Sequence, residues 1–246
     1  GFFKREREGY LYINCVQAIY YKNIYNKSYQ LLTKPIFSYQ RISMNYLIVS
    51  DIYGLTPALR RLSHAISSNL VIVDPYNNKY QAIESEQDSY NNFIQQCGHD
   101  KYTDKLQKCF ESLKVPTTCI AFSAGASAAW RAQLLTGNTH LKKLIGFYPS
   151  QIRNYLALDA KVPCEFIFPA SESHFNVDEV IKALSTKAGV KCYKTNFLHG
   201  FMNEYSTNFN AQGLVEPWNA NTRTFANGDV RLALVDTIEP AAGAFH

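Results

Sequence analysis

Short apolar runs alternate with amphipathic patterns through the middle of this chain. The apolar runs that predict strands lie at 46–49, 70–73, 117–122, 144–148, 164–168 and 191–197. Helical spacing follows several of them. Thr56-Pro57 opens a pattern in which Leu59, Leu62 and Ile66 share one face. Alternation of strand and helix predicts right-handed crossovers, and therefore an α/β fold with a mostly parallel central sheet and helices on both faces.

The remaining patterns divide the chain into three regions. Residues 44–210 hold all the strand and helix alternation, including a helical spacing around Phe110 and another over 177–184. The polar stretch that ends at Gly98 is assigned no element. Residues 1–43 are rich in Tyr, Lys, Asn and Gln, and we expect an N-terminal extension of edge strands or an arm. Residues 211–246 form a C-terminal extension in which Asn227-Gly228 predicts a β-hairpin.

Polar residues come directly after several predicted strands. Asp51, Ser123, Glu172 and His199 all have this placement. In parallel sheets, ligands bind at the carboxyl ends of the strands. The shared placement therefore indicates one functional site.

The segment Ala121-Phe122-Ser123-Ala124-Gly125 has the pattern of a nucleophile elbow, with alanine in place of the first glycine. A serine on a tight turn between strand and helix exposes its hydroxyl beside amide groups of the helix start. The small residues are needed because the two backbones nearly touch there. The alternative is an inert turn serine.

The order of Ser123, an acid and then His199 is that of α/β hydrolases. Four segments make residues 46–201 similar to the dienelactone hydrolase family of that fold. They are Val49-Ser50-Asp51-Ile52-Tyr53-Gly54, Asp74-Pro75-Tyr76, the elbow, and His199-Gly200-Phe201. The resemblance covers about two thirds of the chain and implies an α/β-hydrolase fold.

The resemblance also implies roles for individual residues. Ser123 would attack a carbonyl carbon, and His199 would take its proton and pass it to the leaving group. The backbone N–H groups of Ala124 and Ile52 would hold the developing oxyanion. Asp51 stands where the family has a glutamate beside the nucleophile. Its alternative role is to cap the helix that follows. No cofactor and no metal is implied.

Two departures from the family pattern matter. Well-known members have cysteine at the elbow, whereas this chain has Ser123, which depends more on a base. The family's acid would fall at Ser173, which is not acidic. Glu172 is adjacent, Asp178 is the fallback, and the third possibility is that no acid orients the histidine. Alternatively, Glu172 is a solvated loop acid and His199 a structural histidine.

Composition narrows the classes of partner. The net charge is +5, but residues 1–43 hold seven basic and two acidic side chains, so the rest is neutral. This disfavours nucleic-acid binding. No apolar run is long enough to span a membrane, and the first residues lack the apolar core of a secretory signal. The six cysteines form no C-x-x-C pair and predict buried thiols. We therefore expect a cytoplasmic protein.

Together these observations predict a serine hydrolase of the dienelactone hydrolase-like type. It would cleave a small-molecule ester, lactone or thioester through an acyl-serine intermediate. The alternative is a non-catalytic scaffold of the same fold that binds a ligand or partner. The missing acid at Ser173 and the unusual ends of the chain favour that alternative. No oligomeric state is assigned.

Overall fold

The computed structural model describes residues 45–83 and 85–214. The predicted N-terminal extension and the predicted hairpin around Asn227-Gly228 lie outside these residues. None of the described helices is both long enough and apolar enough to cross a membrane.

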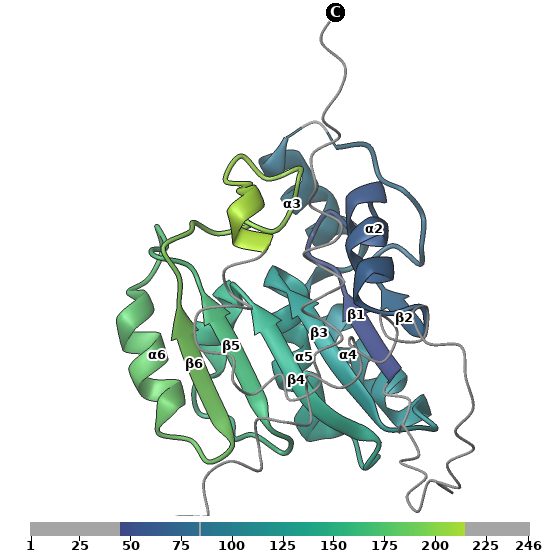
Figure 1. The fold of residues 1–246 in the computed structure, drawn as a ribbon, viewed down its shortest axis with the longest axis vertical. Coiled ribbons are helices and arrows are strands. Elements are labelled where there is room, and N and C mark those ends of the chain that lie inside the picture. The colour runs from purple at the N-terminus through teal and green to yellow at the C-terminus, as the bar shows by residue number, and fades with distance from the viewer. Residues whose placement is uncertain (1–44, 84, 215–246) are drawn as a thin grey trace, which may run out of the picture. The chain divides into compact units, whose positions relative to one another are not determined.

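A parallel sheet forms the centre of the described chain. Its strands lie in the order β2-β1-β3-β4-β5-β6, and each neighbouring pair is parallel (Figure 1). The strands are β1 (Asn45–Val49), β2 (Leu70–Val73), β3 (Thr117–Phe122), β4 (Leu141–Phe147), β5 (Cys164–Phe168) and β6 (Val190–Lys194). The predicted parallel sheet is confirmed.

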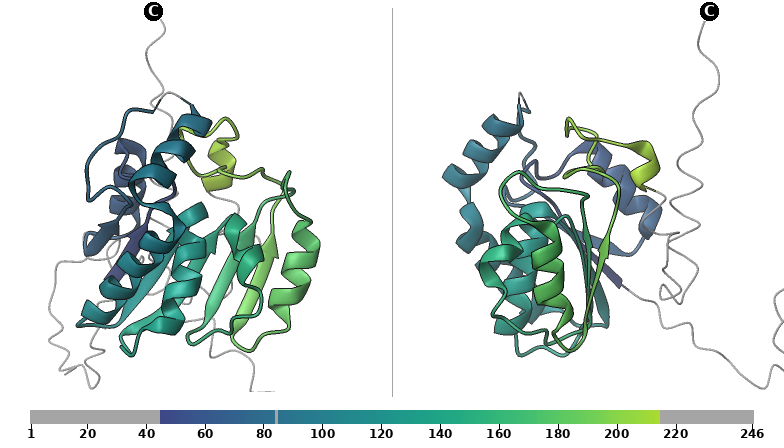
Figure 2. Two further views of the ribbon diagram at one scale, coloured as in Figure 1. Left: turned by 180° about the vertical axis from the view of Figure 1, so that it is seen from behind. Right: turned by 90° about the vertical axis from the view of Figure 1, so that its left-hand side faces the viewer.

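Helices pack on both faces of this sheet (Figure 2). On one face, α2 (Pro57–Ile66) packs beside β1 and β2, and its apolar residues share a core with Phe201 and Met202. The helices of the other face are α3 (Glu86–Gln96), α4 (Gly98–Ser112), α5 (Ser123–Leu135) and α6 (Val177–Ser185). Two short 3₁₀ helices, η1 (Ser150–Tyr155) and η2 (Ala211–Leu214), complete the described elements.

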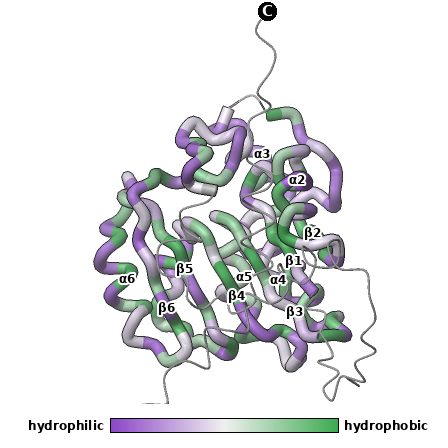
Figure 3. Tube along the Cα trace, viewed as in Figure 1, coloured by the Kyte–Doolittle hydropathy of each residue, from purple (hydrophilic) through white to green (hydrophobic). Residues whose placement is uncertain are grey.

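The central strands are apolar on both faces because each face meets a separate core (Figure 3). In β3, Cys119 and Ala121 point to the four-helix side, whereas Ile120 and Phe122 point to the side of α2. This alternation explains why the strands appear in the sequence as continuous apolar runs. The described cysteines are free thiols. Cys97, Cys119 and Cys164 are buried as expected, whereas Cys109 and Cys192 are partly exposed.

Several elements differ from the sequence prediction. Strand β4 begins at Leu141 rather than at 144. The polar stretch before Gly98 contains α3, in which Phe93 is fully buried and Ser85 caps the first turn by accepting from the Asp88 N–H at 3.0 Å. Strand β6 ends at Lys194 rather than at 197. Its partner β5 is followed by Pro169, which has no N–H to continue the ladder.

The elbow between β3 and α5 is held by close packing against β1. A side-chain Cβ at Gly125 would lie 2.2 Å from the Ser50 carbonyl oxygen and 2.8 Å from Val49 Cγ1. No Cβ fits at these distances. Ser123 has a φ of 47°, a left-handed conformation that costs energy for a residue other than glycine. The packing at Gly125 therefore fixes the turn on which the serine stands.

We expect Gly125→Ala to lower stability by about 1–3 kcal/mol, the usual cost of overpacking. In a domain of this size that is roughly 2–4 °C in Tm for each kcal/mol. Gly137→Ala is the matched control because nothing lies within 4 Å of its Cβ position. Thermal unfolding followed by circular dichroism compares the two variants, and equal melting temperatures would contradict the packing argument.

Candidate active site

Ser123 lies at the centre of the candidate site. It is the first residue of α5, directly after the buried strand β3, and is 8% exposed. Tyr148, the residue after β4, also has a left-handed backbone, with a φ of 40°. Strained non-glycine residues therefore stand at the ends of two adjacent strands. Such strain persists only where the surrounding structure enforces it, and it is typical of functional sites.

The structure brings Ser123, His199 and Glu172 together in one hydrogen-bonded line. Ser123 Oγ lies 2.9 Å from His199 Nε2, and His199 Nδ1 lies 2.7 Å from Glu172 Oε1. The Glu172 side chain is 9% exposed and the imidazole 23%. Glu172 is thus not a solvated loop acid. An acceptor carboxylate at Nδ1 favours the tautomer whose Nε2 can accept the serine proton.

The other acids considered for this position lie elsewhere. Asp178 forms an exposed ion pair with Lys194, with Nζ–Oδ1 at 2.8 Å. Ser173 and its neighbour His174 are both exposed. The loop after β5 therefore places Glu172 on the histidine, one residue before the position that the family pattern indicates.

The loop after β6 holds the backbone of His199. Asn208 Nδ2 donates to the His199 carbonyl oxygen at 3.0 Å. Gly200 has a φ of 82°, and a Cβ there would lie 2.4 Å from Ser206 Oγ. On the other side, the Tyr148 ring packs against the imidazole with centroids 5.0 Å apart. The imidazole is therefore fixed by its backbone, its ring face and its two hydrogen bonds.

Asp51 is buried at the end of β1 and does not hydrogen-bond to Ser123. One carboxylate oxygen accepts from the Tyr53 N–H at 3.0 Å, and the other accepts from Asn203 Nδ2 at 2.5 Å. Burial raises the pKa of Asp51 to about 6, although the Asn203 hydrogen bond, the Tyr53 N–H and His199 counteract this effect. Asp51 does not cap α2, because Thr56 Oγ1 accepts from the Leu59 N–H.

The two expected oxyanion donors belong to the start of α5 and to the loop after β1. Ala124 is the second residue of α5, where backbone N–H groups have no partner within the helix. The Ile52 carbonyl oxygen accepts from the Tyr76 hydroxyl at 2.6 Å, which orients the loop after β1. The N–H groups of Tyr53 and Gly54 turn back to Asp51. The Ile52 N–H makes no hydrogen bond to another described residue.

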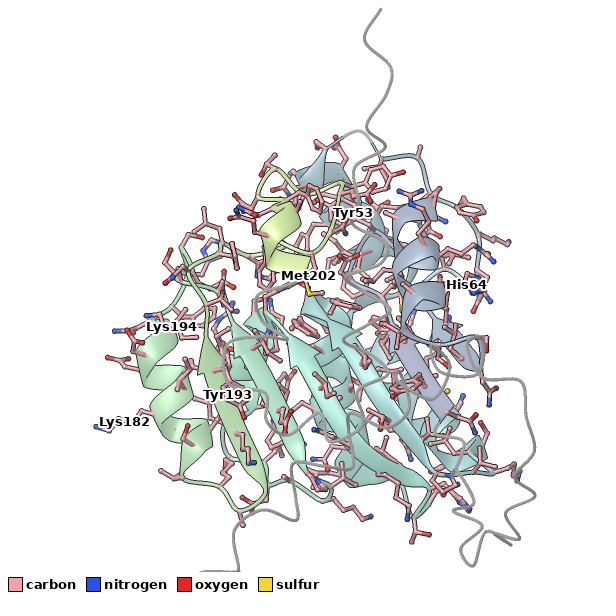
Figure 4. All side chains as sticks on the ribbon, in the orientation of Figure 1. Tyr53, His64, Lys182, Tyr193, Lys194 and Met202 are labelled. Atoms are coloured by element: carbon pink, nitrogen blue, oxygen red, sulfur yellow. The ribbon has the colours of Figure 1, made fainter. Side chains whose placement is uncertain are left out.

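A small pocket lies at the carboxyl ends of the strands, between the first half of α2 and the loop after His199. In Figure 4, Met202 lies at the carboxyl ends of the strands, with Tyr53 beyond it. The pocket is lined by Asp51, Gly54, Thr56, Ala58, Leu59, Leu62, Phe122, Tyr148, Met202 and Asn203. Tyr148 lines the pocket and its ring also packs on His199, so the pocket shares this wall with the candidate site, although neither Ser123 nor His199 lines it. Trp130 lies in the core under α5 and does not line it.

An elbow serine after a central parallel strand, followed in sequence by an acid and then a histidine, is the α/β-hydrolase arrangement. The chain has the α/β-hydrolase fold. Within the described residues, no group of three or more His, Cys, Asp or Glu side chains is placed to hold a metal ion.

The chain is similar to parts of several known proteins. No family model matches the chain. It is 33% identical over 93 residues to the uncharacterized protein YczH of Bacillus subtilis. The aligned residues make up 37% of this chain and 45% of that relative, so the chain spans less than half of the relative's length. Similar solved structures include a dienelactone hydrolase-like promiscuous phosphotriesterase from metagenomic libraries (12% identity, 64% of this chain and 72% of that chain, TM-score 0.47). Another is α/β hydrolase domain-containing protein 10 from mouse (9% identity, 79% of this chain and 88% of that chain, TM-score 0.47).

Sequence reasoning missed Asn203 as a site residue. Asn203 pairs with Asp51, 152 positions earlier, and neither composition nor spacing marks such a pair. Its neighbours make two further contacts to the same region. Glu204 pairs with Arg61 at 2.7 Å, and the Tyr205 ring stacks on Tyr53 with centroids 6.4 Å apart. Three successive side chains therefore fasten the loop after His199 to the loop after β1 and to α2.

The raised pKa of Asp51 predicts a specific pH dependence of stability. The folded protein binds this proton more tightly than the unfolded chain, so ionised Asp51 costs stability. That cost develops as the pH rises from about 4 to about 6 and is constant above. Asp51→Asn lacks it. The free energy of unfolding of the wild type, relative to this variant, should therefore fall by roughly 2–3 kcal/mol between pH 4 and pH 7.5.

Urea unfolding at the two pH values measures this difference. Asp104→Asn, at an exposed carboxylate on α4, is the control and should show a constant difference from the wild type. A pH-independent difference for Asp51→Asn would contradict the assignment of a buried, partly compensated charge.

Proposed function

We propose that the protein is a serine hydrolase of the dienelactone hydrolase-like type, acting on a small-molecule ester, lactone or thioester. The observation that carries this proposal is the line of two hydrogen bonds, 2.9 Å from Ser123 Oγ to His199 Nε2 and 2.7 Å from His199 Nδ1 to Glu172. A serine hydroxyl is a weak nucleophile until a neighbouring base takes its proton. This line supplies the base and the group that orients it.

The reaction follows from these positions. Ser123 Oγ forms a bond to the carbonyl carbon of the substrate while its proton passes to His199 Nε2. The carbonyl oxygen becomes an oxyanion beside the N–H groups of Ala124 and Ile52, each such donor being worth roughly 3 kcal/mol of barrier. The carbon–oxygen or carbon–sulfur bond then breaks, and His199 gives its proton to the leaving group. Water repeats the sequence on the acyl-serine and releases a carboxylic acid.

The backbone of Ser123 favours catalysis over a scaffold that binds without reacting. A protein that only binds a ligand has no need of a non-glycine residue at a φ of 47°. Gly125 is nevertheless packed so closely on Ser50 that the strained turn is enforced. The carboxylate of Glu172 is also buried against the histidine rather than solvated. Both features have a cost that catalysis explains.

A fluorophosphonate probe tests the proposal. Ser123 Oγ would bond to phosphorus and displace fluoride, and the serine proton would pass to His199. Intact-mass analysis should show one adduct per chain, absent from Ser123→Ala and strongly reduced in His199→Gln. Ser127→Ala, on the same helix, should label normally because its hydroxyl only donates to the Ser123 carbonyl. No adduct at any pH between about 6 and 9 would reject the hydrolase.

The role of Glu172 has its own test. Glu172→Gln should reduce kcat by about 10⁴-fold, the loss that a wrong histidine tautomer causes in a serine protease. Asp178→Asn is the matched control and should keep kcat, since Asp178 pairs with Lys194. Initial rates on a short-chain aryl ester, with circular dichroism to verify folding, measure both. Loss of activity in the control alone would transfer the orienting role to Asp178.

A further inference from the structure

The pocket that shares Tyr148 with the candidate site carries one charged group. Asp51 is the single ionisable acid among the lining residues, and no lysine, arginine or histidine lines the pocket with it. Most of the remaining wall is apolar, from Leu59, Leu62 and Met202 among others. An acyl group that enters this pocket therefore meets a carboxylate without a cationic partner to neutralise it.

The carboxylate of Asp51 is held rigidly in that wall. The Tyr53 N–H and the Asn203 amide each donate to a different oxygen. Asn203 is itself fixed, since its Oδ1 accepts from the Tyr205 N–H at 2.9 Å. The carboxylate therefore cannot turn away from a bound substrate.

Two donors leave part of the hydrogen-bonding capacity of this carboxylate unused. An ionised carboxylate has about four acceptor positions, so a donor on the substrate finds a vacant one. A substrate carboxylate would instead lie against a like charge in a partly desolvated pocket, where repulsion is screened less than in water. The geometry therefore separates acyl groups by charge.

We propose that Asp51 is a specificity-determining residue that admits acyl groups that are neutral or carry an ammonium or hydroxyl donor, and rejects acyl groups that carry a carboxylate. This inference rests on the proposed hydrolase function. It assigns Asp51 to substrate selection, whereas the proton transfers belong to His199 and Ser123.

The titration of Asp51 adds a test that needs no substitution. The titratable groups that interact with Asp51 are His199 and Glu86, together with the hydroxyls of Tyr53, Tyr76, Tyr102 and Tyr148. Near pH 5.5 much of Asp51 is protonated, because burial raises its pKa to about 6. At pH 8 it is ionised. Discrimination against anionic acyl groups should therefore be weaker at the lower pH.

Three aryl esters with acyl chains of equal length provide the experiment, one neutral, one ending in an ammonium and one ending in a carboxylate. At pH 8 the wild type should show kcat/KM at least about 10-fold lower for the anionic than for the neutral ester. The ammonium ester should equal or exceed the neutral one. In Asp51→Asn the anionic-to-neutral ratio should rise to within about 3-fold of one. At pH 5.5 the wild-type ratio should move in the same direction.

Glu86→Gln is the matched control. It removes a charge of the same sign that acts on Asp51 from α3 but does not line the pocket, so the wild-type ratio should persist. Turnover of all three esters at similar kcat/KM would overturn charge selection and leave the hydrolase intact. An equal change of the anionic-to-neutral ratio in Asp51→Asn and Glu86→Gln would also overturn charge selection by Asp51 and leave the hydrolase intact. No turnover together with no fluorophosphonate adduct would overturn both proposals.

Discussion

The close contact between α5 and β1 is the constraint on which the site depends. Gly125 lies against the Ser50 carbonyl, and this contact holds Ser123 in a left-handed turn at the carboxyl end of β3. Because all described strands are parallel, the loops after β1, β5 and β6 end at the same edge. The loops after β5 and β6 bring Glu172 and His199 to the serine, and the loop after β1 carries Asp51. Backbone packing thus positions the Ser123 hydroxyl, and the loops supply the side chains around it.

Much of this arrangement is contained in local patterns. Strands buried on both faces leave continuous apolar runs, so β1, β2, β3 and β5 are visible in the sequence. The elbow requires small residues, and Ala121, Ala124 and Gly125 supply them. Placement of polar residues after strand ends was enough to group Ser123, His199, Glu172 and Asp51, because parallel topology converts that placement into proximity.

The features that were missed depend on contacts between distant residues. Helix α3 buries little besides Phe93, so its polar sequence has no amphipathic signal, although Ser85 and Asp88 form a capping pair. The path of the loop after β5 decides which acidic residue reaches His199. Alignment with the family pattern does not locate that residue to a single position. Asn203 becomes important only because the loop after β6 returns to Asp51. The spacing of apolar and polar residues carries no information about such a long-range contact.

The tautomer of His199 tests most directly whether this imidazole is oriented by Glu172 to act as the base for Ser123. In ¹⁵N-histidine-labelled protein, the spectrum of a neutral imidazole distinguishes a proton on Nδ1 from one on Nε2. His199→Gln identifies the His199 signals among the six histidines of the chain. We expect a proton on Nδ1, held by Glu172, and a free electron pair on Nε2 that accepts from Ser123. A proton on Nε2 would contradict it, because the imidazole could not then act as the base for Ser123.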